Sequence, residues 1–184
     1  MQSYTGLERK FCQFDADLAV TDGVKIEGYA SYFGREDRGG DIVQPGAYAA
    51  SLSRLAQDGR QVKLLWQHDP TQPIGVWDQV HEDDVGLFVK GRLLEGVERA
   101  REAAALISAQ AIDGLSIGYR TLKAVKNDKG RRLLQELELW EVSLVTFPML
   151  PSARVGAKDE TLVQDSLREL AAAFEDARTE MAQM

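Results

Sequence analysis

The chain has 184 residues and a formal net charge of −7, from 22 Lys and Arg against 29 Asp and Glu. Hydrophobic residues make up 44% of it and charged residues 28%, a composition typical of a globular domain rather than a disordered or collagenous chain. This acidic balance offers no basic field to neutralise phosphates, so we expect no nucleic-acid partner.

Cysteine content and hydropathy set the expected compartment. The single cysteine, Cys12, cannot form an internal disulfide, and the first residues lack the apolar stretch of a secretory signal. No window reaches the ~20 apolar residues that span a bilayer. We therefore expect a cytoplasmic protein without a membrane partner.

The first third of the chain predicts a hairpin, a loop and a short helix. Residues 11–20 and 24–33 are strand-like runs on either side of a Thr-Asp-Gly turn. Four glycines and several charges mark residues 34–46 as a loop. Pro45 then opens a helical pattern in which apolar residues recur four and three positions apart, at Tyr48, Leu52 and Leu55.

The middle of the chain predicts three strands, a helix and a second hairpin. Residues 61–68 read as a strand whose alternate side chains share one side with His68, and a stop follows at Asp69-Pro70. Two more strands are expected at 74–81 and 85–93, and the Ala-rich residues 97–112 predict a helix. A long hairpin then pairs residues 115–125 with 133–146.

We expect two regions, an α+β domain over residues 1–156 and a helical tail over 157–184. Within 161–181 apolar residues follow a heptad seam, at Val163, Leu167, Leu170, Phe174, Ala177 and Met181. From Lys158 onward seven acidic residues stand against three basic ones. Such a helix either docks on another helix or folds back on its own domain, and about three heptads are too few to choose.

A histidine-dependent mechanism has few possible members, because the chain has only two histidines. His81 stands beside the acidic turn 82–84 and reads as a solvated strand-end residue. His68 ends an apolar strand, where it is either a hydrogen-bonded structural histidine or a general base.

Ser116 is the candidate nucleophile. It stands between Gly114 and Gly118 on one face of a strand, which leaves its hydroxyl open to the close approach of another backbone. A Gly-x-Ser-x-Gly nucleophile elbow joins a strand to a following helix, whereas here a helix precedes and a strand follows. The alternative is that these small residues only permit a tight bend of the sheet.

Glu141 is the candidate acid. It shares strand parity with a row of leucines, so its carboxylate is expected to be partly buried and to need a hydrogen-bond donor. An imidazole N–H would serve, and so would Arg120 or a backbone amide. A slip in strand register would place Glu136 or Glu138 on that face instead.

Together these three residues have the chemistry for acyl transfer. Ser116 would attack a carbonyl, His68 would take its proton, and Glu141 would fix the imidazole tautomer and stabilise the imidazolium. Triads occur in several chain orders, so spacing alone does not show that the three side chains meet.

Four ordered motifs carry a family resemblance. They are Asp37-Arg-Gly-Gly-Asp-Ile-Val-Gln-Pro-Gly-Ala-Tyr48, Leu65-Trp-Gln-His-Asp69, Gly114-Leu-Ser-Ile-Gly-Tyr119 and Trp140-Glu-Val-Ser-Leu-Val145. Over about residues 25–155 the chain resembles the prohead (capsid maturation) serine proteases of HK97-type tailed phages. Particles called gene transfer agents carry similar proteins.

This resemblance implies a fold like that of herpesvirus assemblin, a small, mainly antiparallel β-barrel flanked by helices, with His68 as base and Ser116 as nucleophile. The herpesvirus enzymes use a second histidine after the serine as third member, and here that place falls to Glu141. We expect no cofactor and no metal. The oxyanion hole is expected in the loop 147–154.

The resemblance also implies the partners. The substrate would be the scaffolding segment of the major capsid protein, and then the protease itself, inside the assembling capsid in the bacterial host cytoplasm. The tail at 161–181 would bind scaffold helices or a second copy of the chain, and self-cleavage would remove it.

Two other function classes compete with a serine protease. One is a catalytically silent scaffolding or structural protein of the same capsid. The other is a metal-dependent hydrolase that uses His68, Asp69, His81 and the acidic turn 82–84. Cys12 lies between two phenylalanines in a strand-like run and reads as core rather than nucleophile.

Overall fold

The computed structural model describes residues 8–13, 25–37 and 39–146. They form one eight-stranded sheet and two helices. In chain order the elements are β1 (Glu8–Gln13), β2 (Lys25–Tyr32), β3 (Asp41–Val43), α1 (Ala49–Gln57), β4 (Lys63–Trp66), β5 (Asp69–Glu82), β6 (Gly86–Leu93), α2 (Glu98–Ser108), β7 (Gly114–Lys126) and β8 (Arg132–Val145). The expected α+β class is confirmed, and neither described helix is long and apolar enough to cross a membrane.

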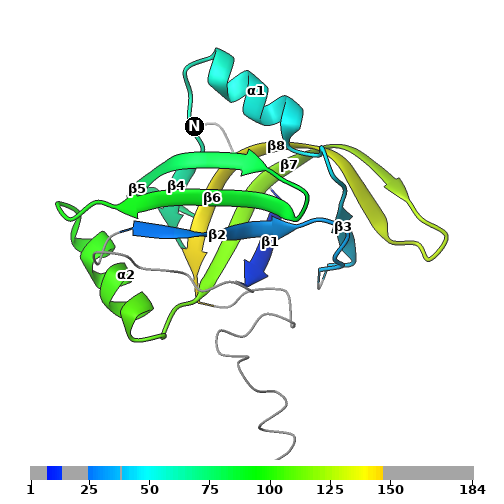
Figure 1. Cartoon of the computed structure of the whole chain (residues 1–184). Coiled ribbons are helices and arrows are strands. Elements are labelled where there is room, and N and C mark those ends of the chain that lie inside the picture. The colour runs from blue at the N-terminus through cyan, green and yellow to red at the C-terminus, as the bar shows by residue number, and fades with distance from the viewer. Residues whose placement is uncertain (1–7, 14–24, 38, 147–184) are drawn as a thin grey trace, which may run out of the picture.

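The sheet curls into a half-barrel around one core. Its strand order is β1-β7-β8-β4-β5-β6-β2, and β3 pairs with β8 beside that path. Neighbours are antiparallel except β3 and β4, which both run parallel to β8. The two end strands, β1 and β2, contact each other, so the order nearly closes on itself (Figure 1).

The core lies inside the curl, where aliphatic side chains from most strands meet. Its fully buried members include Ile26, Leu64, Ile74, Leu87, Leu115, Ile117, Leu134 and Leu137. The helix α1 packs on β5 and β8, and α2 packs on β5 and β6 from another side (Figure 1). The α1 contact includes a buried hydrogen bond, because the Leu139 N–H donates to Ser51 Oγ at 2.9 Å.

The motif that begins at Asp37 folds into a loop that anchors β3. Asp37 Oδ1 accepts the backbone N–H groups of Gly39 and Asp41, both at 2.9 Å. Asp41 in turn accepts from Arg132 Nε at 2.8 Å, and the same guanidinium pairs with Glu8 on β1. One arginine therefore joins β1, β3 and β8, and these carboxylates raise the pKa of Arg132.

The hairpin expected from 11–20 and 24–33 is wrong. β1 pairs with β7, with Phe11 opposite Ser116, and β2 pairs with β6, with Tyr29 opposite Phe88. Periodicity shows which side chains of a strand are buried but does not name the partner strand. The intervening residues 14–24 lie outside the described part of the chain.

The loop predicted over 34–46 is wrong in part, because it contains strand β3, which pairs with β8. The remaining elements follow the sequence with shifted ends. The hairpin of β7 and β8 is confirmed, while the helix predicted over 97–112 ends at Ser108. The strand predicted over 61–68 ends at Trp66, and β5 begins at Asp69 rather than 74. Its early prolines are tolerated because the pairing of β4 with β5 is irregular there. The loop 147–154 and the tail 161–181 lie outside the described residues.

Gly86 allows β6 to approach β2 at an irregularity in their register. An added Cβ would overlap the Ser31 carbonyl oxygen and lie 3.0 Å from its carbon, and backbone atoms cannot yield as a flexible side chain does. We expect Gly86→Ala to lower the free energy of unfolding by about 1–3 kcal/mol, measured by urea denaturation.

The matched control for this prediction is Gly96→Ala, because a Cβ at Gly96 would meet nothing within 4 Å. We expect that variant to unfold at the wild-type urea concentration or slightly above it. Equal midpoints for both variants would contradict the close approach of the two strands.

Candidate active site

A strained two-residue turn presents His68. Trp66 and Asp69 pair across the β4–β5 hairpin, and the two residues between them, Gln67 and His68, have φ angles of +50° and +61°. Positive φ at both central positions is the geometry of a type I′ turn, which usually carries Asn-Gly. The side-chain alternation predicted from 61 to 68 therefore stops at Trp66, and this turn, rather than strand parity, sets the direction of the His68 ring.

Strand β8 holds this turn from one side. The Gln67 N–H donates to the Leu144 carbonyl at 2.9 Å, and Gln67 Nε2 donates to Thr146 Oγ1 at 2.7 Å. The His68 N–H donates to Ser143 Oγ at 3.2 Å. These hydrogen bonds hold Gln67 and His68 in a left-handed backbone conformation, which residues other than glycine seldom adopt without such support.

His68 and Glu141 form a buried pair. His68 Nδ1 lies 2.5 Å from Glu141 Oε1, and the two side chains are 4% and 6% exposed. An ionised carboxylate only accepts hydrogen bonds, so Nδ1 carries the proton and Nε2 is the basic nitrogen of the neutral ring. This is the tautomer that a general base needs.

Ser116 lies on the same face of the sheet as this pair. In the β7–β8 register Ser116 stands opposite Ser143, and Gly118 stands opposite Glu141. Directly opposed residues of an antiparallel pair project to one face, with Cα atoms about 4.5–5.5 Å apart. Strands β7 and β8 and the β4–β5 turn thus bring Ser116, Glu141 and His68 to one face of the sheet, and all three residues are buried.

Gly118 makes room for the carboxylate. A Cβ at this position would overlap Glu141 Oε1 and lie 2.7 Å and 2.9 Å from Glu141 Cδ and Cγ. The Glu141 side chain therefore lies across the bare backbone of β7. This explains one of the two glycines that flank Ser116 in the sequence.

The other carboxylates on β8 have different partners. Glu138 pairs with Arg120 at 2.5 Å, and Glu136 lies 3.8 Å from Arg54. Among the three acids that strand parity left open, Glu141 is the one that reaches His68. The alternative that Arg120 compensates Glu141 is wrong, since that arginine lies against Glu138.

The residues of the metal-hydrolase alternative fall into two groups that lie far apart. His68 and His81 stand at opposite ends of β5, and His81 is exposed with its ring centroid 5.3 Å from that of Phe88. Asp69 accepts the Thr71 N–H at 2.8 Å. Within the described ranges, no three His, Cys, Asp or Glu side chains gather in a way that could hold a metal ion.

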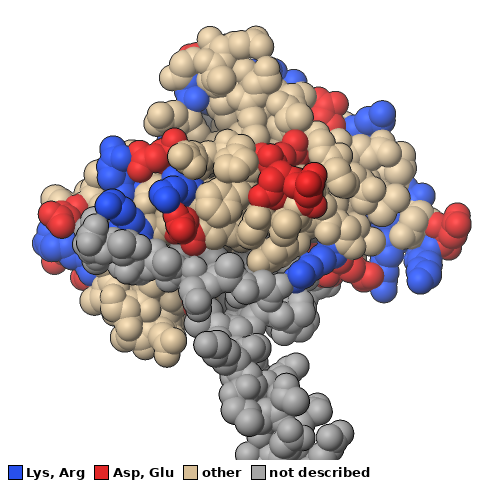
Figure 2. Space-filling view, viewed as in Figure 1, with Lys and Arg blue, Asp and Glu red and all other residues tan. Residues whose placement is uncertain are grey.

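The acidic turn 82–84 forms the red patch between β5 and β6 in Figure 2 and has structural roles. Glu82 accepts the Tyr48 N–H at 2.9 Å. Asp83 accepts the Tyr29 hydroxyl at 2.6 Å, and this bond raises the pKa of Tyr29 to about 12. The carboxylates of Glu82 and Asp83 therefore stabilise the fold around the turn.

Sequence reasoning missed Ser143. Its Oγ donates to Glu141 Oε2 at 2.6 Å and accepts from the His68 backbone, so it contacts both members of the pair. The available signal was its position two residues after Glu141 on one strand, which places both side chains on one face.

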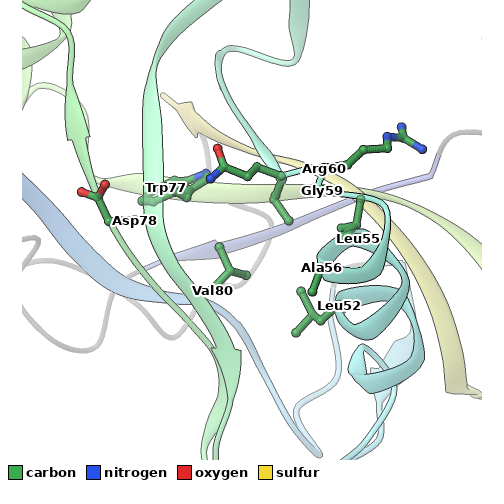
Figure 3. A pocket seen from close by; sticks show the side chains of 10 residues that line it. Leu52, Leu55, Ala56, Gly59, Arg60, Trp77, Asp78 and Val80 are labelled. Carbon is green, nitrogen blue, oxygen red and sulfur yellow. The ribbon is translucent and has the colours of Figure 1, made fainter.

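A cavity of about 420 Å³ lies elsewhere, between α1 and β5 (Figure 3). Its walls include Leu52 and Leu55 from the helix and Trp77 and Val80 from the strand. None of the three candidate catalytic residues lines it. The candidate site therefore lies apart from this hollow.

The chain is similar to a known protein family and to known individual proteins. The family model described as caudovirus prohead serine protease matches residues 13–166. The prohead protease of Enterobacteria phage HK97 is 34% identical over 138 residues, which cover 72% of this chain and 59% of that protein. The chain thus spans less than two thirds of that relative's length. The structure of the bacteriophage T4 capsid assembly protease matches with a TM-score of 0.64 and 16% identity, over 78% of this chain and 98% of that one, and shows a shared fold.

Gly118→Ala tests the packing of the carboxylate. The added Cβ must displace Glu141, so we expect the hydrogen bond to His68 Nδ1 to lengthen or break. In a protein labelled with ¹⁵N-histidine, the downfield proton of that bond would disappear or shift upfield. Only two histidines need assignment.

Gly96→Ala is again the control and should leave the His68 signal unchanged, because its Cβ has open space. A folded Gly118→Ala variant with a wild-type His68 spectrum would show that Glu141 does not lie over β7.

Proposed function

The chain belongs to the family of caudovirus prohead serine proteases, and on that premise we propose that it is a serine endopeptidase of capsid maturation. Ser116 is the nucleophile, His68 the general base and Glu141 the orienting acid. The observation that carries this assignment is the buried 2.5 Å contact of His68 Nδ1 with Glu141 Oε1, on the face of β8 that Ser116 shares.

The proposed reaction follows from the roles of these atoms. Ser116 Oγ attacks the peptide carbonyl carbon while His68 Nε2 takes the hydroxyl proton, and Glu141 stabilises the resulting imidazolium. As the C–N bond breaks, His68 gives that proton to the leaving amine. Water then attacks the acyl-enzyme by the same route and restores Ser116.

Burial strengthens the electrostatic part of this reaction. Both side chains of the His68–Glu141 pair are more than nine-tenths buried, so the attraction between carboxylate and imidazolium acts in a medium of low dielectric constant. We propose the loop 147–154, which follows β8 beyond the described residues, as the source of the oxyanion hole.

The proposed substrate is the scaffolding segment of the coat protein, followed by the protease itself, within the immature capsid. The similarity to the HK97 prohead protease supports this. A silent structural protein of the same capsid remains the second candidate, and turnover at Ser116 separates the two.

Co-expression with the cognate coat protein tests the enzyme. We expect the wild type to remove a segment from the coat protein, seen by intact mass spectrometry, and Ser116→Ala and His68→Ala to leave the coat protein intact. Glu141→Gln should slow cleavage by about 10³- to 10⁴-fold, as in triads whose acid is made neutral.

Matched controls separate chemistry from folding. His81→Ala removes the exposed histidine, and Glu138→Gln removes a carboxylate that pairs with Arg120; both should cleave the coat protein at the wild-type rate. Uncut coat protein with the wild type, in particles that contain it, would favour the silent structural protein.

The tail at 161–181 is proposed to bring the protease into the particle through its heptad seam. Leu170→Glu together with Phe174→Glu places two charges on the seam, so we expect this chain to be lost from purified proheads by quantitative mass spectrometry. Ala172→Glu together with Thr179→Glu adds the same charge off the seam and should be packaged normally. Equal packaging of both variants would argue against a docking tail.

A further inference from the structure

We propose that Ser143 is a positioning residue of this site, whose hydroxyl holds His68 and Glu141 in their working orientation. The proposal rests on the function proposed above, and it concerns a side chain outside the Ser116, His68 and Glu141 set. Ser143 acts through the other two residues rather than on the substrate.

Three hydrogen bonds form a closed ring through Ser143. The His68 N–H donates to Ser143 Oγ at 3.2 Å, and the Ser143 hydroxyl donates to Glu141 Oε2 at 2.6 Å. Glu141 Oε1 accepts from His68 Nδ1 at 2.5 Å and closes the ring. Both carboxylate oxygens are thereby engaged, so the group cannot rotate without breaking a bond to one partner.

The backbone of His68 needs this restraint. Its φ of +61°, next to +50° at Gln67, lies in the left-handed region that residues other than glycine seldom occupy. Such a conformation persists where surrounding groups hold it. Ser143 binds the N–H of the strained residue itself, while Leu144 and Thr146 hold Gln67.

Burial makes the hydroxyl hard to replace. Ser143 is 0% exposed, and the side chains of His68 and Glu141 are 4% and 6% exposed. Solvent therefore has little access to take over either bond if the hydroxyl is removed. Without it, the His68 amide loses an acceptor and Glu141 Oε2 loses a donor.

The same bonds distinguish Ser143 from the nucleophile. Ser143 directs its proton at a carboxylate and its oxygen at a backbone amide, so on both sides it supports the base. Ser116 faces it across the β7–β8 pair. Of the two serines that face each other in the register, Ser116 therefore reacts and Ser143 positions the base.

The test uses the full-length chain and a fluorophosphonate probe. Ser116 Oγ forms a bond to phosphorus as the P–F bond breaks; fluoride leaves, and the serine proton passes through His68 to water. Saturation kinetics, followed by intact mass, give the maximal rate of labelling and the probe concentration at half that rate.

For Ser143→Ala we expect the maximal labelling rate to fall by about tenfold to a hundredfold, because a misoriented His68 accepts the Ser116 proton less efficiently. The half-saturating concentration should stay within about twofold of the wild type, since Ser143 does not touch the probe. The downfield His68 Nδ1 proton signal should broaden or shift in the same variant.

Ser51→Ala is the matched control. Like Ser143→Ala, it removes a buried serine hydroxyl that accepts a backbone N–H, here that of Leu139 at 2.9 Å, and so carries a similar loss of stability. We expect a lower melting temperature, an unchanged labelling rate and an unchanged His68 signal. If Ser143→Ala does not fold, Ser143→Cys, which fills the space with a slightly larger group that forms only weak hydrogen bonds, is judged by the same criteria.

The outcomes separate the two proposals. A wild type that the probe does not label, or labelling that survives Ser116→Ala, overturns the proposed function. Ser116-dependent labelling that is equally fast in Ser143→Ala, or that Ser51→Ala slows as much, leaves the function standing and overturns the role of Ser143.

Discussion

The pairing of β8 with two strands of opposite direction is the constraint on which this structure depends. β7 runs antiparallel to β8 on one side, and β4 runs parallel to it on the other. The first pairing places Ser116 and Gly118 beside Ser143 and Glu141. The pairing with β4 places the end of that strand so that the turn after it brings His68 over Ser143 and Glu141. A shift of one residue in either register would move these groups to opposite faces.

A buried ionisable pair imposes further demands on its surroundings. Glu141 and His68 lie away from water, where a charge without partners is costly. The chain meets this with two hydrogen bonds to the carboxylate and with a glycine beneath it. To place His68 beside Glu141, the backbone adopts a strained left-handed turn at Gln67 and His68, and hydrogen bonds to β8 hold this turn. Stability and the proposed chemistry therefore depend on the same strand.

Local features of the fold were predictable and long-range ones were not. The β7–β8 hairpin follows from two strand patterns joined by a short turn, and α2 follows from its Ala-rich period. The hairpin expected at the start of the chain is wrong because β1 and β2 pair with β7 and β6, far along the sequence. An alternating pattern is equally compatible with any partner strand, and only the closing of the sheet selects one.

The same division applies to the candidate site. The sequence by itself determined the residue types, since two histidines and one serine between glycines leave few choices for base and nucleophile. Tertiary structure decided which carboxylate reaches His68, because Glu141 is buried beside that ring whereas Glu136 and Glu138 lie against arginines. It also decided the place of Ser143. Side-chain parity along one strand is a local property, whereas the register between β4, β7 and β8 is set by packing of the whole half-barrel.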